Sequence, residues 1–224
     1  MSVSVGRRTY EADATNVGDV LGLDGLGLRA RVFPLRRGTW DSASEPVLRG
    51  RRRPLLLVDG VVLHIVTVRG REGAELLGPG DLIPVDDDTE TFTARDRVLV
   101  PGGFTVIDER VLVSAAAQPQ LLGAFGEAAI RQAGQLAGQV VLAQQVAIDD
   151  RLRILLPSLA ERWGRVTSDG VVLPSFLSHT VLSALVGARR PSLTAAVGRL
   201  VEDGTVRRLP DRRWLLCGGL DGIG

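Results

Sequence analysis

Short apolar runs separated by turn residues occupy roughly residues 15–116. Asp59-Gly60 lies between the aliphatic runs 55–58 and 61–68, and such a dipeptide between two apolar runs predicts a β-hairpin. The same pattern predicts further strands at 74–77, 97–100 and 104–108, with turns at 69–73, 78–81 and 101–103. Many short strands at this spacing are typical of a sandwich, jelly roll or barrel.

A helical pattern replaces the strand pattern from about residue 119 to 147. Apolar or small residues recur there at alternating spacings of four and three: Leu122, Gly126, Ala129, Ala133, Leu136, Val140, Ala143 and Ala147. Such a seam predicts either a helix packed on its own β domain or a helix paired with a second copy. The length and narrowness of the seam favour a homodimer. We expect its interface at Leu122, Ala129, Ala133, Leu136, Val140 and Ala143.

The segment after residue 147 alternates helix and turn. Asp149-Asp150 is a suitable acidic start for a helix that runs to Trp163. Pro157 lies inside this helix and is expected to kink it or to mark a restart. A short strand is expected at 171–173.

Two short helices and a hairpin follow. Ser178 is a candidate N-cap for a helix ending near residue 186, and Gly187 is expected to form the turn after it. Pro191 suits the first position of a second helix, which runs to about residue 203 before Gly204. A terminal hairpin is predicted over residues 205–217.

This order of elements predicts a winged helix-turn-helix. Leu182, Leu185 and Val186 would face inward from the first helix, and the i, i+4, i+7 set Leu193, Val197 and Leu200 would form the buried stripe of the second. The opposite face of the second helix is short-chained and polar, as a helix in the DNA major groove requires. The candidate DNA-contacting residues are Ser178, Arg189, Arg190, Ser192, Thr194, Ala195, Arg199, Arg212 and Arg213. Hairpin residues Arg207 and Arg208 would add positive charge.

Charge divides the chain in the same place. Residues 1–150 hold 16 arginines and 20 acidic residues, a net charge of −4, whereas residues 151–224 hold 11 arginines and 6 acidic residues, a net charge of +5. The basic part is therefore the better candidate for contact with phosphate. All 27 basic residues are arginine, which excludes chemistry that needs a lysine amine.

Few residues suit a metal or redox centre. The one cysteine, Cys217, excludes an intrachain disulfide and a four-cysteine iron–sulfur cluster, and two histidines are too few for an ordinary zinc site. His64 alternates with apolar residues on a strand, which favours a structural role over haem ligation. Asp86-Asp87-Asp88 suits a solvated loop better than a divalent-cation site. The arginines Arg49 and Arg51–Arg53 suit a solvated loop better than a site for an anion or an acidic surface.

The segment from Leu177 to Val197 resembles the helix-turn-helix of the cyclic-AMP receptor protein/FNR (Crp/Fnr) superfamily of bacterial transcription regulators. Its turn follows the superfamily pattern Val-Gly-x-x-Arg-x-[ST]-[VL], here Val186 to Leu193. Glu75 to Asp81 is similar to the Leu-x-Pro-Gly-Asp turn of the superfamily's sensor jelly roll. The resemblance covers nearly the whole chain and is most specific in the last third.

The resemblance implies roles for several residues. Arg190 matches a guanine-reading arginine, and Ser178 and Ser192 match phosphate-contacting hydroxyls. Pro191 and Ala195 replace a base-reading glutamate and a second base-reading arginine, so the operator should differ; Ala195 suits contact with a thymine methyl group. Asp86 to Glu90 place carboxylates where the superfamily's phosphate cassette would lie, which argues against cyclic AMP.

We therefore expect an α+β protein with three parts: a β jelly-roll, cyclic-nucleotide-binding-like sensor domain (1–118), a dimerisation helix (119–147) and a winged helix-turn-helix domain (148–224). The expected function is a dimeric, sequence-specific transcription regulator without enzyme activity. Its partners would be double-stranded DNA with a pseudo-palindromic operator and a second copy of the chain, with RNA polymerase as a further candidate. No cofactor, metal or membrane is expected, the effector stays unknown, and the expected location is the cytoplasm.

Two alternatives remain open. One is a small-ligand-binding jelly roll, although a cupin-like enzyme would need a histidine cluster that two isolated histidines do not supply. The other is a degenerate regulator that acts through protein contacts without a ligand.

Overall fold

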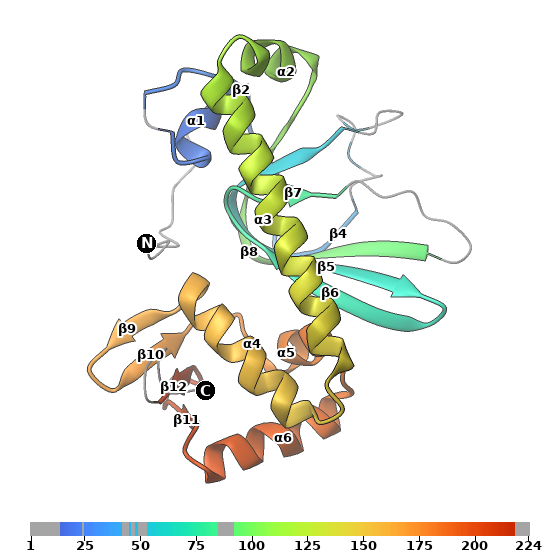
Figure 1. The fold of residues 1–224 in the computed structure, drawn as a ribbon, viewed down its shortest axis with the longest axis vertical. Coiled ribbons are helices and arrows are strands. Elements are labelled where there is room, and N and C mark those ends of the chain that lie inside the picture. Colours follow the sequence, from blue (N-terminus) through green and yellow to red (C-terminus); the bar gives the residue numbers. More distant parts are fainter. Residues whose placement is uncertain are drawn as a thin grey trace. The chain divides into compact units, whose positions relative to one another are not determined.

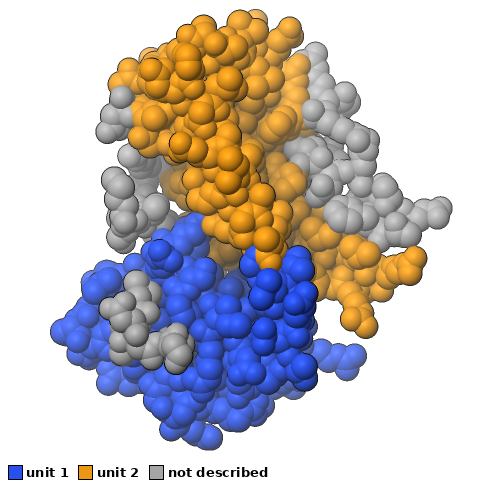
Figure 2. Space-filling view, viewed as in Figure 1, with its two compact units in different colours: residues 1–4, 138–224 blue, residues 5–137 orange. Residues whose placement is uncertain are grey.

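The computed structural model describes residues 14–23, 25–41, 45, 48, 53–84 and 92–217. The chain forms two compact units, one made of residues 5–137 and the other largely of residues 138–224 (Figure 2). The α+β class predicted from the sequence is confirmed (Figure 1). Among the described helices, none is both long enough and apolar enough to span a membrane.

The unit of residues 5–137 contains an antiparallel β domain. Its main sheet has the strand order β3-β8-β5-β6, with β4 paired to β8 and β7 paired to β5. The strands are β3 (Phe33–Leu35), β4 (Gly38–Trp40), β5 (Leu55–Val68), β6 (Arg71–Leu77), β7 (Leu82–Ile83) and β8 (Phe92–Val106). Before them, β1 (Ala14–Asn16) and β2 (Arg29–Arg31) form a separate pair around the short helix α1 (Val17–Val20).

The hairpin predicted at Asp59-Gly60 is wrong. Residues 55–68 form the single strand β5, and its pairing with β8 shifts register between Leu57 and Val62. Gly60 adopts φ +93°, and a Cβ on Gly102 opposite would lie 2.0 Å from the Asp59 carbonyl oxygen. The two glycines therefore permit a β-bulge in which the strands approach closely. For the same reason, the turn predicted at 101–103 lies inside the continuous strand β8.

The other two predicted turns exist, one of them shorter than expected. Arg69 and Gly70 alone join β5 to β6, and residues 71–73, which were predicted as part of this turn, begin β6. In the segment 78–81, the amide of Asp81 donates to the Gly78 carbonyl, and the Gly78 amide donates to the buried Asp81 carboxylate at 2.8 Å. The Leu57 amide also donates to the Asp81 carbonyl, which attaches this turn to β5.

The end of the segment predicted as β-structure is helical. Asp108 caps α2 (Glu109–Ala116) by accepting the Val111 N–H at 3.0 Å. Val111 and Ala115, four residues apart, are the buried positions of this helix. The sequence pattern did not indicate α2, because two apolar positions four residues apart in so short a segment also fit the alternation of a strand.

The continuous apolar run at the start of β5 is explained by burial on both faces of the strand. Leu55 and Leu57 join one hydrophobic cluster with Trp40 and Phe104, whereas Leu56 joins a second cluster with residues of α1, β2 and α2. Successive side chains of a strand point to opposite faces. An unalternating run is therefore the pattern expected of a strand between two cores.

A buried polar group connects this β domain to α3 (Pro119–Gln144). His64 Nδ1 lies 2.9 Å from the Asp96 carboxylate, and Glu75 is paired with His64 on the neighbouring strand. Gln132 of α3 donates to Glu75 at 3.4 Å and to the Leu82 carbonyl at 2.9 Å. His64 thus has a carboxylate partner that the apolar sequence around it did not reveal.

The unit that holds residues 138–224 contains a helical core and a four-stranded sheet. Its elements are α4 (Ile148–Trp163), β9 (Arg165–Thr167), β10 (Gly170–Leu173), α5 (His179–Leu185), α6 (Arg190–Glu202), β11 (Val206–Arg208) and β12 (Trp214–Leu216). The antiparallel sheet has the order β11-β12-β10-β9. Helix α4 continues through Pro157 without the predicted restart. Strand β9 was not anticipated from the sequence.

Candidate nucleic-acid interface

Helices α5 and α6 are delimited by residues that the sequence identifies. The Ser178 hydroxyl oxygen accepts the Val181 N–H at 3.4 Å and caps α5. Gly187 has φ +62° in the turn, and Pro191 lies in the first turn of α6 after the N-cap Arg189. The predicted helix-turn-helix elements are confirmed, with α5 one residue shorter than expected at its end.

The two faces of α6 differ as its spacing predicts. Leu193, Val197 and Leu200 are at most 6% exposed, and they pack in the same unit as the buried Leu182, Leu185 and Val186 of α5 and its C-cap. The other face is exposed at Arg190, Ser192, Thr194, Ala195 and Arg199, and Gly198 is half-buried. Apart from Val201 in its last turn, which is 42% exposed, this face presents no large apolar side chain. It is therefore narrow and mostly polar, which suits a DNA groove.

Salt bridges hold α6 against α4. Arg199 makes two hydrogen bonds to the Asp149 carboxylate, at 2.6 and 2.5 Å. The hydrogen bond from Arg199 is the main cause of the lowered pKa of Asp149. At the end of α6, Arg153 bonds to Asp203 and, at 2.8 Å, to the Thr205 hydroxyl. The Arg199 guanidinium therefore already donates two hydrogen bonds within the domain.

Backbone groups near the turn are satisfied in the same way. Arg151 donates to the Val186 carbonyl at 2.8 Å and to the Gln145 carbonyl at 2.8 Å. The Ser178 amide donates to the Phe176 carbonyl at 2.8 Å. The hydroxyl hydrogen of Ser178 is the group left to serve an outside acceptor.

His179 links α6 to the β11–β12 hairpin. Its ring stacks on Trp214, with centroids 5.4 Å apart and planes 9° from parallel, and its Nδ1 lies 3.2 Å from the Thr194 hydroxyl. Its Nε2 is buried without a hydrogen-bond partner among the described residues. Burial lowers the pKa of His179, with smaller contributions from Arg208 and Arg190. The His179–Trp214 contact joins residues 35 positions apart, so no local pattern in the sequence indicates it.

The hairpin β11–β12 carries the wing arginines. Arg208 lies over the Trp214 ring at 4.2 Å, and Arg207 pairs with Asp169 at 3.0 Å. Arg213 pairs with Asp211 at 2.6 Å across the turn. Arg212, at φ +68°, has no ion pair or side-chain hydrogen bond within the described chain, and the same is true of Arg189 and Arg190. Within α5, α6 and the β11–β12 hairpin, these three guanidinium groups are therefore available to an outside partner.

The predicted seam of α3 is exposed in a single chain. Leu122, Leu136 and Val140 are 55%, 46% and 61% exposed, and Ala129, Ala133 and Ala143 are exposed as well. The helix buries a different set of positions, which includes Leu121, Ala128, Gln132 and Leu142. The seam positions are therefore not the ones that α3 buries within a single chain, as one of the two readings of the pattern would require. Ala147, the last seam position, lies beyond α3 and is the N-cap residue of α4.

Several sequence candidates lie outside the described residues, namely Asp86-Asp87-Asp88, Glu90, Arg49, Arg51 and Arg52. Within the described ranges, no group of three or more histidine, cysteine, aspartate or glutamate side chains is arranged to hold a metal ion.

No protein-family model matches the chain, and no curated protein matches it in sequence. Many solved structures share its fold. A cyclic nucleotide-binding domain containing protein from Listeria monocytogenes matches with a TM-score of 0.68 and 13% identity, over 89% of this chain and 94% of that one. The Thermus thermophilus protein TTHB099, a transcriptional regulator of the CRP family, matches with a TM-score of 0.62 and 17% identity, over 83% of this chain and 91% of that one.

A third similar structure is TTHA1359 from Thermus thermophilus, a transcriptional regulator of the CRP/FNR family. It matches with a TM-score of 0.54 and 20% identity, over 86% of this chain and 96% of that one. The chain has the Crp/Fnr fold. At these identities the likeness establishes the fold, and it confirms at that level the resemblance seen in the sequence. The Crp/Fnr fold includes both units, so the winged helix-turn-helix and the β domain belong to one known arrangement of elements.

Proposed function

We propose that this protein is a Crp/Fnr-type transcription regulator that binds double-stranded DNA through α6 and the β11–β12 wing. The observation that carries the proposal is the outer face of α6: Arg190, Ser192, Thr194 and Ala195 are exposed together opposite a fully buried stripe. A helix anchored by one face and polar on the other is suited to lie in a major groove. Regulators that share the fold support the same function.

Arg190 is the proposed base-reading residue. Its guanidinium is exposed and makes no side-chain contact with the described residues, so its forked donors are available to the O6 and N7 of guanine. Ala195, five positions further along the same helix, offers a methyl group to thymine. Thr194 is held by His179 and by the Arg190 carbonyl, at 3.2 and 3.0 Å, which restricts its rotamer.

Contacts to phosphate are assigned to the surrounding residues. Arg189 and Arg212 have free guanidinium groups, and Ser178 and Ser192 have exposed hydroxyls. Arg213 would exchange its pairing with Asp211 for a phosphate, and Arg199 would contribute through the field of its charge while bound to Asp149. These contacts fix position on the duplex without reading its sequence.

The exposed seam of α3 supports the homodimer. Six apolar or small side chains at heptad spacing form an exposed stripe next to the buried positions of the helix, about 100° further around its axis. Such a stripe is covered when two helices pair. A dimer would present two copies of α6 to successive major grooves, which requires a pseudo-palindromic operator. The proposed domain roles keep the boundaries 1–118, 119–147 and 148–224. RNA polymerase stays a proposed partner, and the acidic segment 86–90 argues for an effector other than cyclic AMP.

The test is sequence selection from random duplexes with the full chain, followed by binding assays on the selected operator. Arg190→Ala should cost about 1–3 kcal/mol on that operator and relax one base position. Arg212→Ala should weaken binding to every duplex alike and reduce the salt slope by about one unit.

Arg71→Ala is the matched control, because it removes one exposed arginine from the β domain. Its affinity should equal that of the parent. If Arg190→Ala lowered affinity equally for all sequences, α6 would not read bases; if no sequence were enriched, the proposed function would be wrong.

A further inference from the structure

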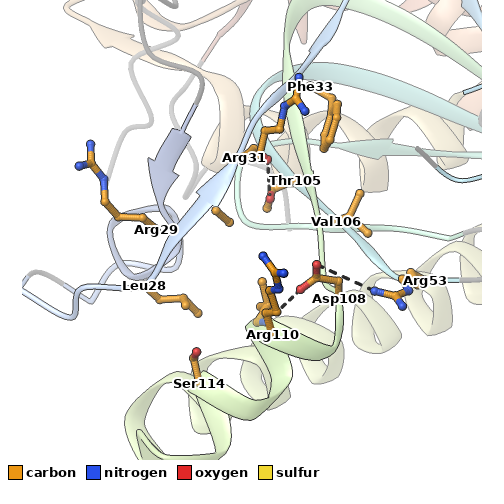
Figure 3. A pocket seen from close by; sticks show the side chains of 12 residues that line it. Leu28, Arg29, Arg31, Phe33, Arg53, Thr105, Val106, Asp108, Arg110 and Ser114 are labelled. Atoms are coloured by element: carbon orange, nitrogen blue, oxygen red, sulfur yellow. Dashed lines mark hydrogen bonds and ion pairs between the residues drawn. The ribbon is translucent and has the colours of Figure 1, made fainter. Parts of the chain in front are cut away.

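We propose that a basic pocket on the outer side of the β domain binds a small ligand with an oxyanion head group and an apolar body. The pocket has a volume of about 360 Å³ and lies where β2, β3 and the end of β8 meet α2 (Figure 3). Cavities of about 300–1,000 Å³ are typical of small-molecule sites. All the residues that line the pocket belong to the unit of residues 5–137, and ligand binding there does not depend on the proposed DNA binding.

The charge of the lining is strongly one-sided. Four arginines and one aspartate contribute to it: Arg29, Arg31, Arg53, Arg110 and Asp108. They come from three segments distant in sequence, so the fold, and not a local basic run, brings them together. The sequence is acidic overall in residues 1–150, which makes this concentration of arginine stand apart from its surroundings.

The single carboxylate leaves most of this charge unbalanced. Asp108 accepts the Val111 N–H as the cap of α2, and it lies 4.0 Å from Arg53. Arg110 rises from α2 near the same carboxylate, with Arg53 on the other side of it (Figure 3). Arg110 makes no ion pair or side-chain hydrogen bond with the described residues. One carboxylate therefore faces two guanidinium groups, and an entering anion would supply the missing negative charge.

Arg31 and Arg29 occupy the rim in different ways. Arg31 lies over the Phe33 ring, with its guanidinium carbon 5.2 Å from the ring centroid, which holds it at the pocket beside Thr105. Arg29 points away from Thr105 and Asp108 (Figure 3), so it adds to the field and not to the direct contacts. Arg53 and Arg110, which lie on either side of Asp108 (Figure 3), are the residues assigned to the oxyanion, since a guanidinium binds carboxylate or phosphate with two parallel donors. Arg31 lies beside Phe33 at the other end of the pocket and adds to the field.

The rest of the lining suits the remainder of a ligand. Leu28, Ala30, Phe33, Val106 and Val111 form apolar walls, and Ser114 adds a hydroxyl from α2. A free inorganic ion would leave these walls in water. A compound with a carboxylate or phosphate on a small aromatic or aliphatic body would cover them and gain from their burial.

Calorimetry on the full chain tests this site with simple probes: phenyl phosphate, benzoate, inorganic phosphate and the neutral benzyl alcohol. We expect one saturable site per chain for phenyl phosphate or benzoate, weaker binding of inorganic phosphate, and none of benzyl alcohol. Binding of phenyl phosphate alone would assign phosphorylated ligands, and binding of benzoate alone would assign carboxylates; either supports the site.

Arg110→Gln and Arg53→Gln should each weaken binding of the probe about tenfold or more. The control Arg71→Gln removes the same charge from an exposed position on β6 and should leave binding unchanged. Equal melting temperatures of the free proteins would show that the variants fold; if one does not, the other variant carries the test. Absence of saturable binding by both anions, undiminished binding in the pocket variants, or an equal loss in Arg71→Gln would overturn the proposal.

Discussion

His179 shows how one side chain supports the proposed interface without belonging to its outer face. It contacts Thr194 of α6 and Trp214 of β12, so it connects the helix to the wing within one unit. Burial and two neighbouring arginines lower its pKa, which means that the folded domain holds the neutral ring. Protonation would add a third positive charge beside Arg208 and Arg190, and the stack on Trp214 would lose its packed, neutral partner.

The lowered pKa of His179 predicts a stability that falls in mild acid. Above the ordinary value of 6.5 the ring is neutral in both states, and its stabilising contribution is complete. As the pH drops below that value, the unfolded chain takes up a proton that the folded chain resists, so the free energy of unfolding decreases. Thermal melts between pH 8 and 5 should show this decrease, and His179→Gln should flatten it.

The control for this residue is His64→Gln, which removes the other histidine of the chain. Its melts should keep the part of the pH dependence that is due to His179. NMR titration of the His179 ring gives a direct reading; a pKa at or above 6.5 would contradict the assigned environment.

At the scale of elements, the strands β5 and β8 depend on two glycines. The β-bulge at Gly60 faces Gly102, and a Cβ added to Gly102 would lie 2.0 Å from the Asp59 carbonyl oxygen. Gly102→Ala must therefore displace backbone, and we expect it to lower the free energy of unfolding by about 1–3 kcal/mol. Gly73→Ala in β6 is the control, because a Cβ there meets nothing within 4 Å; it should change stability by about 0.5 kcal/mol or less. Equal effects in urea denaturation would contradict the close approach.

The same elements show where the sequence was informative. In residues 138–224, the cap Ser178 and the turn glycines Gly187 and Gly204 mark helix ends by local chemistry. Short sequence patterns are therefore enough to predict these elements. In β5, the Asp59-Gly60 signal was local too, but long-range pairing with β8 decided its outcome. The His179–Trp214 stack, the His64–Asp96 pair and the arginine pocket all join distant residues. No spacing rule along one chain identifies such contacts.

At the scale of the whole molecule, the exposed seam of α3 and the outer face of α6 both favour a dimer. A seam of apolar side chains left in water costs free energy, and a single α6 reads only a few base pairs. Pairing two chains through α3 would bury the exposed seam and would double the number of base pairs that the α6 helices could contact. The net charge of +5 on residues 151–224 would also be doubled.

If the dimer forms through α3 and binds the operator with two α6 helices, Leu136→Glu should abolish the dimer and weaken operator binding in the same variant. Leu136 is 46% exposed at the seam, and a carboxylate there would face its own copy across the pair, where like charges and lost apolar burial both oppose association. Val141→Glu is the matched control: Val141 is 54% exposed on the same helix, but five residues further on, about 140° around the axis. Sedimentation should give monomers for the first variant and dimers for the second. Because a monomer can occupy only one half-site, affinity for the full operator should fall towards that for an isolated half-site. Persistent dimers in Leu136→Glu would place the interface elsewhere on the chain, and monomers with full operator affinity would separate DNA binding from dimerisation.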